Sequence, residues 1–397
     1  MRMLLSRTLL AAILAVMAAG CWNVGSVITG GDDDATHYRE ATIERFTKAD
    51  GLPDERVTAV AVSPTEVWVG TAKGVAVMNR QTKQWVVHTR TSTNGKLPSN
   101  EITALARDTR GRIWIGTAKK GVVRVGRLNW DIFDANNELP GSIITAIYAE
   151  PSGVGLDDDN VWVGTTRGLA RYNADGWFVY QAPAVFATLQ DDSMLSDEVR
   201  CLGADDSFLW CGSDKGVARY NDVNWKKWAP EGGFDLETME FTSPDRYPIK
   251  EDEIACISYD GREWLYIAAR RAQIAAFDGA SWRNVPIERG CDITAMQAMP
   301  DGTLWVARHN SLASFSDLRR YDPHTEKWQI MTTADGLPSN QINCIVVEGN
   351  SLWLGTDKGV AHLILPAPAA PAARPNLMDT PAVRPSGPAG ARDSSDD

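Results

Sequence analysis

The feature that most constrains this chain is an internal repeat. The segment GLPDERVTAVAVSPTEVWVGTAKGVAV at 51–77 returns as KLPSNEITALARDTRGRIWIGTAKKGVVRV at 96–125 and as GLPSNQINCIVVEGNSLWLGTDKGVAHL at 336–363. Further copies lie between these, at 138–172, 194–220, 251–277 and 291–315. One aromatic residue recurs in every copy: Trp68, Trp114, Trp162, Trp210, Tyr266, Trp305 and Trp353. Successive aromatics are 46, 48, 48, 56, 39 and 48 residues apart, and a period near 47 is typical of four-stranded propeller blades rather than helical arrays.

Each copy divides into the same four short segments. A short apolar run (strand A) precedes a turn rich in Asp, Gly or Asn, and strand B then carries the recurring aromatic and ends in Gly-Thr. A tight turn leads to strand C, and an outer strand D contributes one more aromatic: Trp85, Phe133, Tyr180, Trp228, Trp282 and Trp328. β-branched and aromatic residues between Gly- and Asp-rich turns favour short antiparallel strands. The pattern therefore predicts an all-β fold of seven four-stranded blades.

The two ends of the repeat region complement each other. The seventh copy stops after its strand C at 363–365, whereas residues 42–47 (TIERFT) precede the first strand A as an orphan strand D. If these residues pair with the last blade, the ring closes and no sheet edge stays exposed. We therefore expect a closed seven-bladed β-propeller over 42–365, and an open solenoid is the alternative.

The repeat resembles a known bacterial family. The order L-P-S-N-x-I, then W-I/V-G-T-x-x-G, is similar to the two-component regulator propeller repeat, with the nearest matches at 98–100 with 114–117 and at 338–340 with 353–356. The resemblance implies a propeller fold, and in that family such propellers are often periplasmic sensor domains of hybrid histidine kinases that respond to oligosaccharides. This sequence carries one ring and no kinase segment, so the fold is expected to carry over and the signalling role is not.

The N-terminal residues 1–20 read as a targeting segment. Two arginines precede an apolar run that is too short to cross a bilayer as a helix. Ala18, Ala19 and Gly20 lead into Cys21, an order that resembles the lipobox of bacterial lipoproteins, although Leu is usual where Ala18 stands. The resemblance implies lipid attachment at Cys21 and a membrane anchor in the cell envelope. An ordinary secretory signal, with Cys21 incidental, is the alternative.

The segments on either side of the ring carry no repeat. Residues 21–41 contain Gly and Asp clusters and read as a solvated tether. Trp22 stands where an Asp would indicate inner-membrane retention in enteric bacteria, so the resemblance favours the outer membrane, facing the periplasm or the surface. Residues 366–397 hold seven Pro and almost no large apolar side chain, and we expect them to be disordered.

Charge and composition exclude several classes of site. The chain has 40 Lys and Arg against 51 Asp and Glu, a net charge of −11, which argues against a nucleic-acid partner. Five His, six Cys and no C-x-x-C motif leave little material for a metal or cofactor site, and we assign none. Cys201, Cys256 and Cys344 occupy a strand A position that other copies give to Ala, so they are expected to be buried thiols. A disulfide between Cys201 and Cys211 on the neighbouring strand remains open.

The turn between strands B and C holds a cation in every copy. These residues are Lys73, Lys120, Arg167, Lys215, Arg271, Arg308 with His309, and Lys358. In a propeller the B–C turns and the D–A loops share one face, so the cations are predicted to ring the channel mouth and bind an anionic or polyhydroxyl ligand or a partner protein. Acidic residues of the D–A loops offer the alternative of plain surface ion pairs. Three connections on this face are longer than their equivalents, at 181–197, 229–251 and 308–317, which favours a recognition surface there.

The 15 Trp residues recur mostly at strand positions, which predicts packing between blades rather than sugar stacking. Trp130, Trp177, Trp225 and Trp264 lie off those positions and are expected to be the more exposed ones.

The sequence thus favours a non-enzymatic, lipid-anchored binding propeller outside the cytoplasm. Two alternatives remain. Some propellers with similar blades look like streptogramin lyases, which use a metal-assisted His/Glu site near the channel, but only His309 is expected near the mouth here. The other alternative is a passive scaffold of an envelope assembly.

Overall fold

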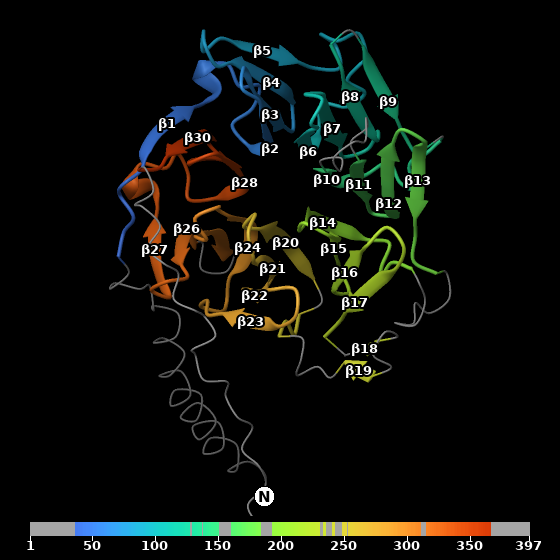
Figure 1. Cartoon of the computed structure of the whole chain (residues 1–397). Coiled ribbons are helices and arrows are strands. Elements are labelled where there is room, and N and C mark those ends of the chain that lie inside the picture. The colour runs from blue at the N-terminus through green and yellow to red at the C-terminus, as the bar shows by residue number, and fades with distance from the viewer. Residues whose placement is uncertain are drawn as a thin grey trace, which may run out of the picture.

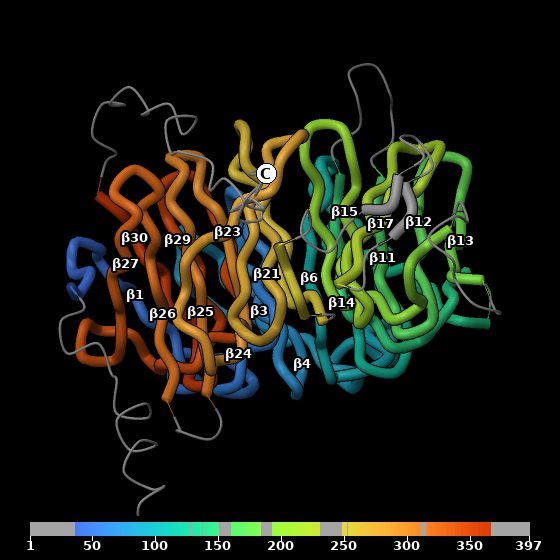
Figure 2. Tube along the Cα trace, turned by 90° about the horizontal axis from the view of Figure 1, so that it is seen from below, coloured from blue at the N-terminus to red at the C-terminus, as the bar shows by residue number. Residues whose placement is uncertain are grey.

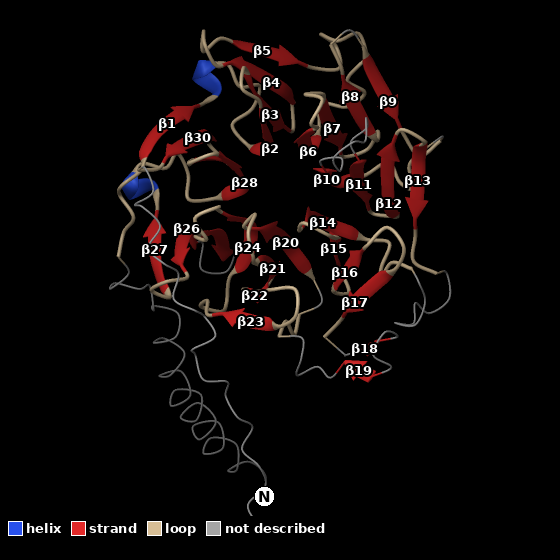
Figure 3. Ribbon diagram, viewed as in Figure 1, coloured by secondary structure: helices blue, strands red, loops and turns tan. Residues whose placement is uncertain are grey.

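The computed structural model describes residues 36–366 except 128, 137, 151–159, 184–192, 231–232, 236–239, 243–247, 252 and 311–314. The expectations for the signal segment, for Cys21 and for the tail beyond Pro366 lie outside the described residues. Within them, seven four-stranded antiparallel sheets surround a central axis, which confirms the all-β propeller (Figure 1). Helical structure there is limited to two short 3-10 turns, Lys48–Asp50 and Thr333–Asp335 (Figure 3).

Each blade runs from an innermost strand A to an outermost strand D. Blade 1 consists of β2 (Val57–Val62), β3 (Glu66–Thr71), β4 (Gly74–Asn79) and β5 (Trp85–His88). Blade 2 consists of β6 (Ile102–Arg107), β7 (Ile113–Thr117), β8 (Val122–Val125) and β9 (Trp130–Phe133). Blade 3 consists of β10 (Ile144–Glu150), β11 (Asn160–Thr165), β12 (Gly168–Asn173) and β13 (Gly176–Tyr180). Blade 4 consists of β14 (Val199–Ala204), β15 (Leu209–Ser213), β16 (Val217–Tyr220) and β17 (Trp225–Trp228).

The later blades follow the same order. Blade 5 consists of β20 (Ile254–Tyr259), β21 (Leu265–Ala269), β22 (Gln273–Phe277) and β23 (Trp282–Val285). Blade 6 consists of β24 (Asp292–Ala298), β25 (Leu304–Asn310), β26 (Phe315–Asp322) and β27 (Lys327–Met331). Blade 7 consists of β28 (Ile342–Glu348), β29 (Ser351–Thr356), β30 (Gly359–Ile364) and β1 (Thr42–Phe46). A hairpin of β18 (Gly233–Asp235) and β19 (Glu240–Thr242) lies outside the ring, between blades 4 and 5.

The N-terminal strand closes the ring, as the sequence predicts. β1 pairs antiparallel with β30, with Phe46 opposite Val360, and supplies the outer strand of blade 7. Blades 7 and 1 are also joined by an ion pair between Arg80 and Glu348 and by a hydrogen bond from Asn343 Nδ2 to the Val57 carbonyl (2.9 Å). Seen from the side, the blades form one short cylinder (Figure 2). Closure leaves no gap between the first and last blades.

The W-x-G-T motif has a packing reason. The strand B tryptophans are almost fully buried between blades, and Trp114, Trp210 and Trp305 expose 0% of their surface. The glycine two residues later admits the next blade, because a Cβ at Gly116 would lie only 2.6 Å from the Ile144 side chain. The threonine then closes the B–C turn, since its hydroxyl donates to the carbonyl of the turn glycine in blades 1, 2, 3 and 7.

Two expectations about side-chain position hold only in part. Trp130, Trp177 and Trp225 are half-buried and thus more exposed than the strand B tryptophans, whereas Trp264 is only 6% exposed. The three half-buried tryptophans begin or lie near the start of strand D and pack between blades. The predicted tether is also shorter than expected, because Tyr38 is 4% exposed and packs edge-on against Trp305 (5.4 Å).

The cysteines within the described residues are all free, so Cys201 and Cys211 form no disulfide. Burial raises the pKa of the Cys211 and Cys344 thiols to about 12. The three residues expected to be buried, Cys201, Cys256 and Cys344, are half-buried, so that expectation is met only in part. No helix among the described residues is long and apolar enough to cross a membrane.

Candidate functional site

The innermost strand of every blade carries a β-bulge near its start. The register skips one residue in all seven blades, for example between Val57 and Ala59 and between Ile144 and Ala146. The skipped residues are Thr58, Thr103, Thr145, Arg200, Ala255, Thr294 and Asn343. A bulge bends the strand and changes the direction of the extra side chain. The repeat therefore places seven side chains, which are not all of the same type, at equivalent positions around the axis.

A cavity of about 480 Å³ opens at this ring. It is lined by the bulge residues of blades 2 to 5, by four further apolar residues, and by Ile143, Glu198 and Arg270. The four bulge residues are Thr103, Thr145, Arg200 and Ala255. Arg270 belongs to the B–C turn of blade 5, so the cavity lies on the face of the B–C turns and D–A loops. This is the face that the sequence predicts for the ligand.

The hydroxyl groups around the ring differ in their bonding. Thr58 donates to the Ile102 carbonyl of the next blade (2.7 Å), and Thr294 donates in the same way to Ile342 (2.7 Å). The Thr103 and Thr145 hydroxyls are buried and have no hydrogen-bond partner in the described structure. Both line the cavity. Since buried polar groups are nearly always bonded, these two unsatisfied hydroxyls set blades 2 and 3 apart from blades 1 and 6.

The charged groups at the mouth form one network. Arg200 lies 3.0 Å from Glu198 and 3.4 Å from Glu253, and its Nε is buried without a hydrogen-bond partner. Arg270 lies 3.2 Å from the same Glu253 and 3.4 Å from Asp292. The hydrogen bond that Arg270 donates to Glu253 raises the pKa of Arg270, so its guanidinium stays charged. The two cations share three carboxylates, so this network has no excess of positive charge.

The predicted rim cations lie outside this network. Lys73, Lys120, Arg167, Lys215, Arg271 and Lys358 are exposed in or beside the B–C turns, and none lines the cavity. Two of them pair with acids of the D–A side, Lys73 with Asp54 (3.3 Å) and Arg271 with Glu251 (3.7 Å). The other four form no ion pair with the described residues.

The turn assigned to blade 6 is a correction. Strands β25 and β26 pair as far as Asn310 and Phe315, so Arg308 and His309 lie within a strand rather than in a turn. Arg308 is 1% exposed because its guanidinium binds Asp317, its register partner, through two hydrogen bonds (2.9 and 2.7 Å). His309 contacts Ser316 through Nδ1 (2.9 Å). Neither side chain is a free cation at the mouth.

The three long connections are only partly within the described residues. The segment 229–251 contains the β18–β19 hairpin, whereas the loop expected at 308–317 is in large part strand, because β25 continues to Asn310 and β26 begins at Phe315. Sequence reasoning missed Thr103, Thr145, Arg200 and Arg270. Aligning the seven copies at the bulge residue of strand A would have found Thr103, Thr145 and Arg200, because Arg200 and Ala255 interrupt a row of Thr and Asn, whereas Arg270 lies in the B–C turn of blade 5 beside the residue that the sequence singles out, Arg271. Within the described residues no cluster of three or more His, Cys, Asp and Glu could hold a metal.

Comparison with known proteins supports the fold. Residues 96–119 match the family model for the two component regulator propeller. No curated protein matches the sequence. Among solved structures, the extracellular domain assigned to a hybrid two component system of B. thetaiotaomicron aligns with a TM-score of 0.61 and 16% identity over 82% of this chain. The chain spans 41% of the length of that structure.

Two further structures are similar over their full length. Virginiamycin B lyase from Staphylococcus aureus aligns with a TM-score of 0.57 and 13% identity, covering 82% of this chain and 100% of the lyase. YCF48 bound to a D1 peptide aligns with a TM-score of 0.55 and 15% identity, covering 85% of this chain and 100% of YCF48. At such identities the likeness shows the fold. The chain is a seven-bladed β-propeller, one segment of which, residues 96–119, matches the two component regulator propeller model.

Proposed function

We propose that this chain is a non-enzymatic binding propeller of the cell envelope, which holds its ligand at the channel mouth. The observation that carries the proposal is the cavity of about 480 Å³ with three unpartnered polar atoms at its wall, the Thr103 and Thr145 hydroxyls and Arg200 Nε. A ligand that bonds to these atoms removes their desolvation cost. Ligand sites usually combine apolar walls with a few convergent polar groups, as here.

The ligand is a polyhydroxyl compound rather than a simple anion. Arg200 and Arg270 are balanced by Glu198, Glu253 and Asp292, so an anion would have to compete with carboxylates already in place. Hydroxyl groups can donate to these carboxylates and accept from the guanidinium groups and threonines at once. The exposed Ile143 side chain (46%) offers an apolar contact beside them.

Similarity to other propellers supports a binding role. The two component regulator propeller repeat and the extracellular domain from B. thetaiotaomicron favour a sensing or ligand-binding module outside the cytoplasm. The similarity to virginiamycin B lyase favours the enzyme alternative, but the histidine expected to serve it, His309, does not line the cavity. We therefore favour binding without catalysis.

Replacing Thr145 by Val tests the site. The side chains have the same shape, and loss of an unpartnered hydroxyl leaves the melting temperature unchanged or slightly higher. Binding of neutral oligosaccharides, measured by calorimetry against a panel, should weaken roughly threefold to tenfold.

Thr58→Val is the matched control. It removes a hydroxyl that bonds to the Gly70 and Ile102 carbonyls, so it should cost about 1 kcal/mol of stability and leave binding unchanged. Equal binding by the Thr145→Val and wild-type proteins, or equal loss in both variants, would contradict the site.

The exposed rim cations form an outer ring that contacts a longer ligand in this proposal. Reversing Lys120, Arg167 and Lys215 to Glu should weaken binding of long oligosaccharides more than of short ones, without lowering the melting temperature. Equal effects on both lengths would remove the rim from the site.

The location is tested at Cys21. We propose that lipid on this residue holds the chain at the outer membrane, because at least two acyl chains give stable attachment. Cys21→Ser should move the protein from the membrane fraction to the soluble fraction. Persistence of the variant in salt-washed membranes would show that the anchor lies elsewhere.

A further inference from the structure

The blades enclose a recurrent cation cage that one blade leaves vacant. In blade 2, Arg124 on strand C lies over three rings, those of Trp114 (5.7 Å), Phe133 (5.5 Å) and Tyr172 of the next blade (5.1 Å). Its Nη1 also donates to the Tyr172 hydroxyl (2.7 Å). A guanidinium group over aromatic faces is stabilised by the ring quadrupoles, more strongly when it is desolvated.

The same position holds a planar cation or a ring in most other blades. Arg171 lies over Trp162 (5.3 Å), Arg219 over Trp210 (5.8 Å), and His362 stacks on Trp353 (4.1 Å). In blade 6, Arg320 lies over Tyr38, which the N-terminal segment supplies (5.2 Å). The cage is therefore a property of the repeat.

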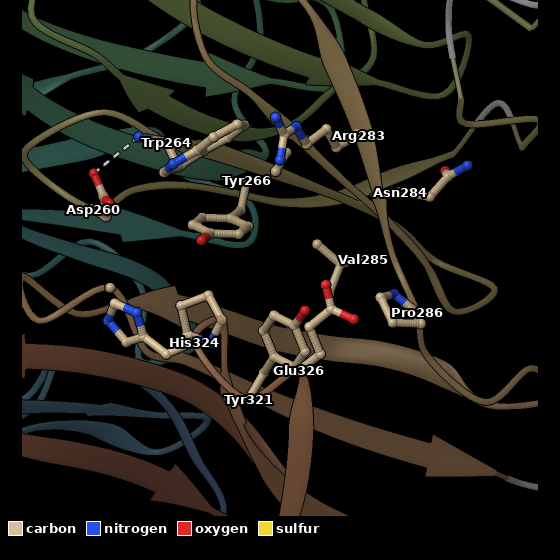
Figure 4. Close-up of a pocket in the computed structure, with 13 residues that line it drawn as sticks. Asp260, Trp264, Tyr266, Arg283, Asn284, Val285, Pro286, Tyr321, His324 and Glu326 are labelled. Atoms are coloured by element: carbon tan, nitrogen blue, oxygen red, sulfur yellow. Dashed lines mark hydrogen bonds between the residues drawn. The ribbon is translucent and has the colours of Figure 1, made fainter. Parts of the chain in front are cut away.

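Blade 5 breaks the pattern at two positions that face each other. Tyr266 replaces the strand B tryptophan, and Ala276, its register partner on strand C, replaces the arginine. The walls remain, since Val285 stands at the Phe133 position and Tyr321 of blade 6 at the Tyr172 position. A cavity of about 190 Å³ is lined by these four residues, and in Figure 4 the Tyr266 and Tyr321 rings border the same space.

The surroundings of this cavity suit a cation. Asp260 and Glu326 line it, and Figure 4 shows the Glu326 carboxylate beside the two tyrosines. Burial raises the pKa of Tyr321 to about 12, and the carboxylates of Glu326 and Asp322 add to the increase. His324 also lines the cavity. The two acids, Asp260 and Glu326, outnumber the one permanent cation in the lining, Arg283.

Arg283 also lines the cavity, and a volume of about 190 Å³ remains beside it. This arginine projects from strand D and lies over Trp264 (5.2 Å), a different ring. Blade 4 shows that a second cation is tolerated at this spacing, because Arg219 and its register partner Lys226 both lie over Trp228 (5.4 and 5.8 Å). Ala276 and Arg283 are register partners in the same way.

We propose that the cavity between blades 5 and 6 binds the guanidinium group of an arginine side chain. It opens among the A–B turn of blade 5 and the C–D turn of blade 6, on the face opposite the channel mouth, so it is separate from the proposed oligosaccharide site. The arginine comes from a partner peptide or from this chain. The chain leaves the ring on this same face, where Leu365 N bonds to the Asn350 carbonyl in the A–B turn of blade 7. The sequence that follows contains Arg374, Arg384 and Arg392.

The probe is a capped Gly-Gly-Arg-Gly-Gly peptide added to the full chain, with the citrulline peptide as its neutral isostere. Binding is followed at the indole N–H resonance of Trp264, which lines the cavity and has no partner in the described structure. A Trp264→Phe variant identifies that resonance. The arginine peptide should shift it at concentrations at least tenfold below those the citrulline peptide requires. Equal effects of both peptides overturn the proposal.

Ala276→Arg restores the arginine of the repeat and supplies the second test. It should raise the melting temperature by roughly 2 °C and abolish binding of the arginine peptide. Val77→Arg is the matched control, since Val77 holds the same position in blade 1 but packs in a buried cluster with Trp68. That variant should melt lower and still bind the peptide. If Ala276→Arg lowers the melting temperature as Val77→Arg does, or still binds the peptide, the cage is not vacant.

Two more variants locate the contacts and the source. Tyr321→Phe keeps the ring and removes a hydroxyl at the position where, in blade 2, the Tyr172 hydroxyl accepts from Arg124. Affinity should therefore fall roughly threefold to tenfold, and unchanged affinity would place the guanidinium outside the cage. Replacing Arg374, Arg384 and Arg392 together by Gln distinguishes the source. Tighter peptide binding after this change identifies this chain's own arginines as the occupant, and unchanged binding identifies a partner's arginine.

Discussion

Ring closure can be measured at Phe46, the aromatic residue of β1. Phe46 stacks on Trp353 (6.1 Å, 18° between planes) and meets Trp85 edge-on (5.8 Å). Removing a fully buried Phe costs about 3–5 kcal/mol, and Phe46 is only partly buried, so Phe46→Ala should cost less, about 2 kcal/mol. With an unfolding entropy of about 2.1 cal/mol/K per residue over about 320 residues, this lowers the melting temperature by roughly 3 °C.

The assay is amide hydrogen exchange together with thermal unfolding. If β1 closes the ring, 2 kcal/mol should raise the local opening of Thr42–Phe46 by roughly 30-fold. Phe133→Ala is the control, because Phe133 makes the same stack on Trp114 (6.0 Å, 21°) inside a continuous blade. It should cost similar stability and leave the exchange of β1 unchanged. Unchanged exchange of β1 in the Phe46→Ala protein would refute the reasoning.

Three further predictions concern buried ionisable groups. Burial lowers the pKa of His362, which stacks on Trp353, so the unfolded chain binds a proton more readily; stability should fall as the pH drops below about 6.5, and His362→Gln should reduce that loss in melting curves between pH 7.5 and 5.5. Asp317→Asn strands the buried Arg308 and should cost about 3 kcal/mol in urea unfolding, whereas a loss below about 1 kcal/mol would contradict the buried pair. Burial raises the pKa of Cys211 to about 12, so this thiol should resist iodoacetamide in the native protein and react once urea unfolds it; labelling of the native protein would contradict its burial.

Much of the fold could be predicted because the same pattern of strands and turns occurs seven times in the sequence. The spacing of the strand B aromatics gave the blade number, and TIERF at 42–46 gave the closing strand. The candidate site was predicted only as a face. The cations at that face were selected because they recur in every copy. A residue that recurs in every copy is kept for packing or for the turn, so recurrence does not identify a ligand site. The lining of the cavity depends instead on where one blade differs, as at Arg200.

The sequence by itself determined the repeat, the strand order, the burial of the strand B tryptophans and the ring. These follow from short-range patterns of apolar, turn and glycine residues, each repeated along the chain. Only the tertiary structure decided which way single side chains point. The bulge directs Thr145 to the cavity, longer pairing in blade 6 buries Arg308 against Asp317, and Tyr266 opposite Ala276 leaves a cage vacant. Each of these depends on contacts between strands or blades far apart in sequence, because a cavity or a buried ion pair exists only where several elements meet.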